Sequence, residues 1–189
     1  MMNRREAINR VALLIGGTVI GGHLFLEGCT RPATKTVEGL FEENQIDFLG
    51  NISDVILPET ATPGAKEAGV GAFIPVMVRD CYTEEDQKIF VDGLDKLEGA
   101  AKKKFSKGFQ ELSFEQRTEL IKEIDKEAND YQAGKKHEEP THYFKMIKEL
   151  TLLGFFTSEL GVTKALRYNP VPGRFEGDIP YKKGDRAWA

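Results

Sequence analysis

The sequence is poor in the residues from which catalytic and cofactor sites are most often built. It contains only three histidines and two cysteines in 189 residues. It lacks a C-x-x-C-H haem motif, a P-loop, a G-x-G-x-x-G turn and a serine nucleophile elbow. His137 and His142 flank a polar stretch without the carboxylate pattern of a metal site, so we expect a surface role for both. We therefore predict no catalytic residue, no metal site and no cofactor in this chain.

A strong excess of positive charge is also missing. The chain has 26 Lys and Arg against 30 Asp and Glu, a formal net charge of −4 at pH 7. The basic run at residues 102–104 is surrounded by acidic residues, which favours a solvated helix surface. Acidic neighbours such as Glu84 and Glu85 diverge on a helix and are interpreted in the same way. This balance excludes a general attraction to nucleic acid.

A hydrophobic run long enough to span a membrane comfortably is absent from the N-terminus. Residues 11–26 are uncharged, but this stretch contains four glycines and is shorter than the roughly 20 residues that a transmembrane helix needs. The adjacent Arg4 and Arg5 precede it, as in a twin-arginine export signal. We predict that residues 1–28 are such a signal; the alternative is a basic, amphipathic start to an ordinary helix.

The first cysteine follows this segment directly. Residues 26–29 read Leu-Glu-Gly-Cys, which resembles a bacterial lipoprotein processing site. Acylation of Cys29 would supply a membrane anchor on the periplasmic side, with residues 29–40 as a tether. The alternative is a soluble periplasmic protein that is cut nearby. The second cysteine, Cys81, falls on an apolar helical stripe and is predicted to be buried and inert.

Apolar residues recur at helical spacing along most of the remaining chain, which predicts an all-α domain of about five helices within residues 41–189. Thr83 and the pair Ser113 and Gln116 have the pattern of helix N-caps. Pro75 is compatible with its helix only in the first turn. The expected helices are residues 41–57, 71–82, 84–105, 114–128 and 141–159, with a defined loop at 58–65 and a polar linker at 132–139.

The character of the chain changes after Gly161. Residues 162–189 contain prolines and aromatic residues without helical periodicity, which predicts an extended tail. A disordered end is seldom so aromatic, so we expect the tail to pack on its own domain or on another protein.

Several irregular strings resemble one family, the small or gamma subunit of gluconate 2-dehydrogenase, also called subunit 3. The strings are residues 3–7, 57–65, 148–159, 166–177 and 184–188. The resemblance implies a non-catalytic subunit of a membrane-associated dehydrogenase of sugars or polyols. It also implies a large subunit that carries FAD and a cytochrome c subunit that carries haem. The small subunit would bind the large one and carry it through the twin-arginine export machinery to the periplasmic side of the membrane.

Buried aromatic and arginine side chains supply most of the affinity at protein interfaces, and prolines limit the entropy that a tail loses on docking. We therefore predict a docking surface on the last helix and the tail; the alternative is that these side chains close the chain's own core. The predicted docking residues are Phe155, Phe156, Arg167, Tyr168, Pro170, Pro172, Arg174 and Trp188. Two rival functions are a lipid-anchored helical module that binds a small ligand such as quinone, and an enzyme that acts alone through carboxylate pairs.

Overall fold

The computed structural model describes residues 40, 41, 43–171, 173, 174 and 177–189. Within this part of the chain, five α-helices are joined by short segments and no strand forms, which confirms the predicted all-α fold. Arg4, Arg5 and Cys29, with the predicted signal and all of the predicted tether except residue 40, lie outside the described residues. The elements are α2 (Glu43–Ile56), α3 (Val70–Cys81), α4 (Glu84–Phe105), the 3-10 turn η1 (Phe109–Glu111), α5 (Phe114–Gly134), α6 (Tyr143–Thr157) and the π-helical turn η2 (Gly161–Ala165).

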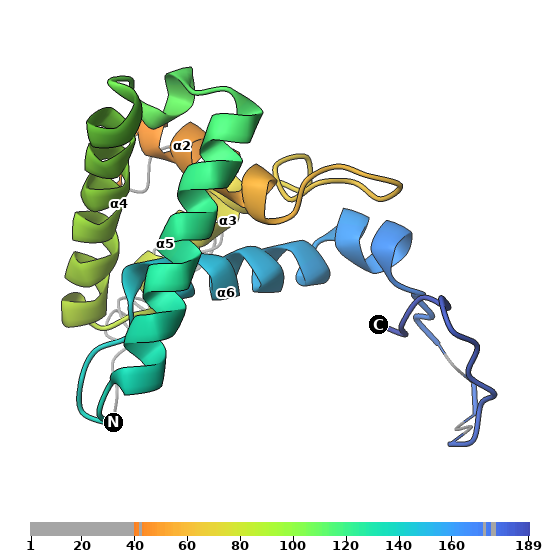
Figure 1. Cartoon of the computed structure of the whole chain (residues 1–189). Helices are drawn as coiled ribbons and strands as arrows, with labels where there is room; N and C mark the ends of the chain where they lie inside the picture. The colour runs from red at the N-terminus through yellow and green to blue at the C-terminus, as the bar shows by residue number, and fades with distance from the viewer. Residues whose placement is uncertain (1–39, 42, 172, 175–176) are drawn as a thin grey trace, which may run out of the picture. The chain divides into compact units, whose positions relative to one another are not determined.

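Helix α6 is central, because it packs against α2, α3, α4 and α5 (Figure 1). Its buried side chains meet the apolar stripes of all four helices. Burial of such side chains is the main stabilising term in a domain of this size. Among the described helices, none is long and apolar enough to span a membrane. The fully or almost fully buried core includes Leu49, Ile52, Ile74, Val78, Phe90, Leu97, Phe109, Phe144 and Ile147.

The predicted helix caps are confirmed. The Thr83 hydroxyl accepts a hydrogen bond from the Asp86 N–H (3.2 Å) at the start of α4. At the start of α5, the Ser113 hydroxyl accepts from the Gln116 N–H (3.3 Å), and the Gln116 side chain accepts from the Ser113 N–H (3.1 Å). These reciprocal bonds satisfy amides that the first turn of a helix leaves without partners.

Glycine allows α4 and α6 to approach closely. A Cβ added to Gly93 would lie 2.3 Å from Cγ of the Tyr143 ring, so the ring lies directly on the α4 backbone. Burial raises the pKa of Tyr143 to about 12. By contrast, a Cβ at Gly99 in the same helix would meet nothing within 4 Å. Only the first of these two glycines is required by packing.

One polar pair lies in the apolar core between α2 and α6. The hydroxyls of Ser53 and Thr151 are 3.2 Å apart, and both residues are fully buried. The Thr151 hydroxyl donates to the Ile147 carbonyl (2.8 Å). Its single proton is therefore used, so Ser53 donates to Thr151. Each hydroxyl has a partner, which removes the penalty of burying it.

The segment between α2 and α3 is a defined loop, as predicted. The Ala65 N–H donates to the Leu57 carbonyl (2.9 Å), and the Thr60 N–H donates to the Thr62 carbonyl (2.9 Å). Ala65 is fully buried, which fixes the base of the loop, whereas Pro58 and Glu59 are exposed. Figure 1 shows this loop, in gold, projecting from the ends of α2 and α3.

Helix α3 corrects two predictions. Pro75 is the sixth residue of the helix, beyond the first turn, and burial of the adjacent Ile74 and of Val78 holds the helix around it. Cys81 is exposed, because the buried face of α3 ends at Val78 and the last turn extends beyond the core.

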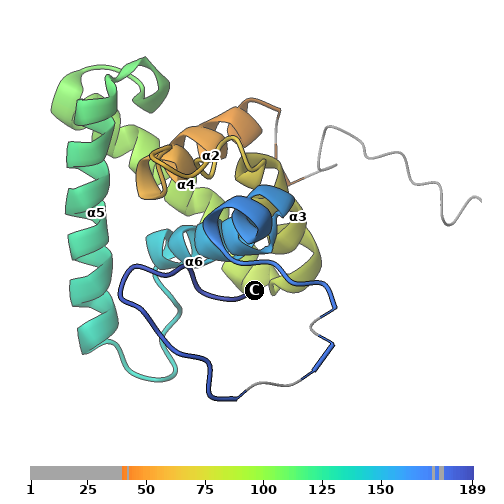
Figure 2. The same ribbon diagram turned by 90° about the vertical axis from the view of Figure 1, so that its right-hand side faces the viewer.

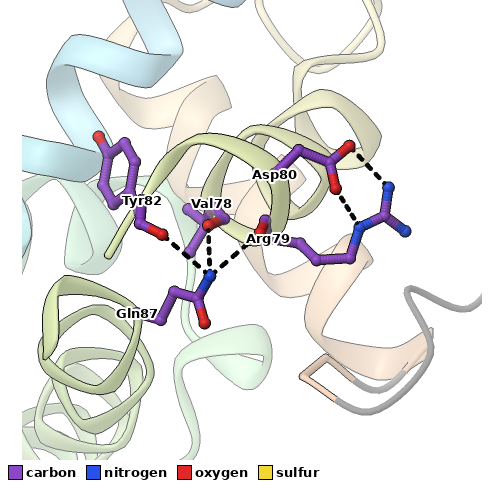
Figure 3. Close-up of polar contacts among 5 residues, drawn as sticks. All are labelled: Val78, Arg79, Asp80, Tyr82 and Gln87. Carbon is purple, nitrogen blue, oxygen red and sulfur yellow. Dashed lines mark hydrogen bonds and ion pairs between the residues drawn. The ribbon is translucent and has the colours of Figure 1, made fainter. Parts of the chain in front are cut away.

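The end of α3 is joined to α4 by the side chain of Gln87 (Figure 3). Its amide nitrogen lies 3.0–3.2 Å from the carbonyl oxygens of Val78, Arg79 and Tyr82. Val78 and Arg79 belong to the last turn of α3, and Tyr82 is its C-cap, where helical donors run out. On the solvent side, the Arg79 guanidinium makes two bonds to the Asp80 carboxylate (2.6 and 2.8 Å).

Candidate docking surface

In the last two turns of α6, two neighbouring aromatic residues have different environments. Phe155 is 4% exposed and belongs to the core, whereas Phe156 is 41% exposed. The two rings meet edge to face, with centroids 5.1 Å apart. Leu152 and Leu153 are also exposed, so this end of α6 presents apolar side chains to solvent. The helix turns the Phe155 ring into the core, which favours the alternative that this side chain closes the chain's own core, whereas the Phe156 ring is accessible. Docking at this end of α6 stays a prediction.

A tight turn connects α6 to the tail. The Ser158 hydroxyl donates to the Phe155 carbonyl (2.7 Å) and accepts from the Gly161 N–H (3.0 Å). A Cβ at Gly161 would lie 1.9 Å from the Phe155 carbonyl oxygen, so only glycine fits this position. The turn η2 follows and leads to Arg167.

The two ends of the tail are joined through Arg167. Its backbone N–H donates to the Ala187 carbonyl (2.8 Å), and its carbonyl accepts from the Ala189 N–H (3.1 Å). These bonds form an isolated parallel bridge between Arg167 and Trp188. We call residues 167–189 the tail loop; Figure 2 shows its end returning to lie beside its beginning.

The Arg167 side chain strengthens the same junction. Its Nε donates to the Arg186 carbonyl (2.6 Å), and its guanidinium lies over the Trp188 ring, 4.7 Å from the centroid. Its Nη2 is 3.7 Å from the Asp185 carboxylate. A planar guanidinium can make these contacts together, whereas a lysine ammonium cannot. We call Arg167 and these contacts the clasp.

The other predicted docking residues of the tail lie on the surface. Tyr168, Pro170 and Arg174 are exposed, and Pro172 lies outside the described residues. Trp188 is about half exposed despite its contact with Arg167. The structure thus brings Arg167 and Trp188 together, and it leaves Tyr168 accessible.

A profile of the gluconate 2-dehydrogenase subunit 3 family matches residues 43–173, which include all five described α-helices and the start of the tail loop. The chain belongs to this family. The prediction of the family is confirmed, and the family is named after a subunit of a dehydrogenase complex. Comparisons with curated proteins and with solved structures give no match. The resembling strings at residues 3–7 and 184–188 lie outside the matched residues and remain a prediction.

Three exposed residues of this subunit 3 family member are not among the predicted docking residues. Val171 is 79% exposed, Tyr181 is 80% exposed, and Ile179 is about half exposed. Their position among prolines and glycines was the one sequence signal of their exposure. A segment without helical periodicity has no apolar face that would turn these side chains toward the core. Such positions expose apolar side chains more often than helical stripes do.

The described helices also form an open cavity of about 580 Å³ between α2, α4 and η1. Its lining includes Phe48 and Leu94, but also the carboxylates of Asp95, Glu98 and Glu111. Glu98 accepts a hydrogen bond from the Phe109 N–H (3.0 Å), so this carboxylate supports the η1 turn. A quinone pocket is expected to be mostly apolar, and this lining does not favour the quinone-binding alternative.

Proposed function

We propose that this chain is the non-catalytic small subunit of a flavin-dependent dehydrogenase of sugars or polyols, and that it binds the catalytic subunit and carries it across the membrane. Membership in the subunit 3 family is the observation that carries this proposal. In the proposed complex, FAD belongs to the large subunit and haem c to a cytochrome c subunit. The complex lies on the periplasmic side of the bacterial membrane.

The distribution of exposed apolar residues supports a docking role. Leu153 and Phe156 at the end of α6, and Tyr168 and Tyr181 in the tail loop, are all at least two-fifths exposed. When a partner covers large apolar side chains that a domain leaves in solvent, the burial of their surface favours binding. Interfaces also draw on aromatic side chains more than on most other types.

Co-purification tests the partnership. The tagged full-length chain would be expressed in the bacterium that makes it, extracted in mild detergent and purified, and its bound proteins would be identified. A visible spectrum with flavin and haem c bands, and sugar or polyol dehydrogenase activity in the purified complex, are expected. A chain that ends at Gly161 but keeps its helical spectrum should lose both. Recovery of the wild-type chain without a flavoprotein would contradict the proposal.

Variants of the N-terminal segment test the export role. Replacing Arg4 and Arg5 together by lysine should leave the dehydrogenase activity in the cytoplasm, because the twin-arginine signal would be lost. Replacing Cys29 by serine should leave export intact and release the activity from the membrane fraction. Export of the catalytic subunit by a strain that lacks this chain would show that transport does not depend on it.

A further inference from the structure

The described residues of the tail loop have no core of their own. Its residues from Tyr168 to the C-terminus are exposed wherever the structure describes them. The clasp holds the two ends of the loop through the backbone bridge and the Arg167 side chain. A second contact, from Nη1 of Arg186 to the Lys164 carbonyl (2.8 Å), ties the returning end to η2.

A hollow of about 530 Å³ lies within the tail loop. Ile179, Tyr181 and Trp188 contribute to its lining, and so do Arg167, Arg186 and Asp185. The Asp185 carboxylate lies 3.7 Å from Nη2 of Arg167, so the positive charge of the hollow is partly balanced. An aromatic hollow of this kind can receive a protruding apolar side chain.

The tail loop and the helical part of the chain carry opposite net charges. Residues 167–189 contain five Lys and Arg against three Asp and Glu, whereas residues 41–166 contain 16 against 24. The tail loop therefore has a net charge of +2 and the helical part has −8. The exposed Lys182 and Lys183 directly follow Tyr181, so positive charge lies next to the most exposed aromatic side chain. An acidic surface complements the tail.

We infer that the tail loop is a docking element shaped before binding, that Arg167 and Trp188 act as positioning residues which hold it closed, and that Tyr181 inserts into an apolar, acid-rimmed surface of the catalytic subunit. This inference rests on the proposed function. Closing a flexible 23-residue segment before docking lowers the entropy that binding must remove. The clasp thus raises affinity without Arg167 touching the partner.

A membrane surface is the other target that aromatic and basic residues can suit. The shape of the described part of the loop favours a protein. A closed loop with an aromatic hollow can fit the fixed relief of a protein surface. A segment that binds a membrane surface needs only an amphipathic character and no fixed shape.

The experiment compares full-length variants in two measurements. The first is the affinity for the purified catalytic subunit, identified by its flavin spectrum. The second is the rate of tryptic cleavage after Arg174, Lys182 and Lys183 in the chain alone, which reports whether the loop is closed. Trp188 is the only tryptophan, so its fluorescence also reports the clasp in every variant that retains it.

Trp188→Ala is expected to speed cleavage and weaken binding roughly tenfold, because an open loop must be ordered on docking. Trp188→Phe retains a ring beneath Arg167 and should restore both values. Tyr181→Ala is expected to weaken binding by about the same factor, as an interface aromatic does, without changing cleavage. Phe114→Ala removes an exposed ring at the start of α5 and serves as the matched control, which should change neither value.

Wild-type affinity in both Trp188→Ala and Tyr181→Ala would overturn the inference while leaving the proposed function intact. Slow cleavage of Trp188→Ala would overturn the clasp, whatever the affinity. Binding to phosphatidylglycerol vesicles that Lys182→Glu and Lys183→Glu abolish, with unchanged binding to the catalytic subunit, would assign the loop to the membrane instead. If the wild-type chain binds no flavoprotein, the proposed function and its docking loop are both wrong.

Discussion

The helical part of the chain and the tail loop keep their shapes in different ways. In the helical part, the apolar faces of α2 to α5 meet on α6, and the residues that hold the fold are buried. In the tail loop, backbone hydrogen bonds and one arginine join the two ends, and the large side chains remain in solvent. The first arrangement gives stability to a scaffold. The second gives a fixed form to a surface that another molecule can cover.

The neighbours Phe155 and Phe156 test whether buried side chains hold the fold while exposed ones do not. Phe155 belongs to the core, and Phe156 belongs to the exposed surface at the end of α6. Phe155→Ala should lower the free energy of unfolding by about 4 kcal/mol, because it removes a buried ring and leaves a cavity. Phe156→Ala should lower it by less than about 1 kcal/mol, because that ring is already partly solvated. Urea unfolding followed by circular dichroism measures both. Equal losses would mean that Phe156 also supports the core.

The glycines of α4 test how closely the scaffold is packed. Gly93→Ala should cost about 3 kcal/mol, since its Cβ would collide with the Tyr143 ring and force α4 and α6 apart. Gly99→Ala faces open space and should raise the stability by about 0.5 kcal/mol through helix propensity. The same unfolding experiment compares the two. A stable Gly93→Ala variant would show that α6 can shift without loss.

His142 adds a pH-dependent contribution to the scaffold. Its Nδ1 accepts a hydrogen bond from the Phe144 N–H (3.2 Å) at the start of α6, and burial lowers the pKa of His142. The contribution of the neutral His142 imidazole to the free energy of unfolding is present in full above the unfolded-state pKa of about 6.5. It is lost as the pH falls through the lower folded-state pKa, because protonation removes the acceptor.

His142→Asn supplies the control, since asparagine can cap the helix without titrating near neutral pH. The stability of the wild type relative to this variant should decline between pH 7.5 and pH 5.5. Parallel pH profiles of the two proteins would assign the dependence to other groups.

The smallest effect on global stability is expected in the tail loop. Trp188→Ala should change the free energy of unfolding by less than about 0.5 kcal/mol, because Trp188 is outside the core. Hydrogen exchange at the amides of Arg167 and Ala189 should nevertheless become faster, since both amides belong to the bridge. A large fall in global stability would mean that the tail loop and the helical part unfold together.

The sequence by itself determined the features that depend on neighbouring residues. Thr83 caps α4 through a bond to a residue three positions away, and Ser113 and Gln116 cap α5 in the same way. Apolar spacing likewise identified the five helices. For α5 the spacing ended too early, because the last turns to Gly134 are mostly polar and carry little periodic signal.

Only the tertiary structure decided which side of an apolar segment faces solvent. Phe155 and Phe156 are adjacent and chemically identical, and packing against α2 to α5 alone distinguishes them. Cys81 continues the stripe of α3 but lies past the point where the core ends. The contacts of Gly93 with Tyr143 and of Arg167 with Trp188 join residues far apart in sequence. Periodicity reports local geometry, whereas these contacts depend on how the chain returns to itself in space.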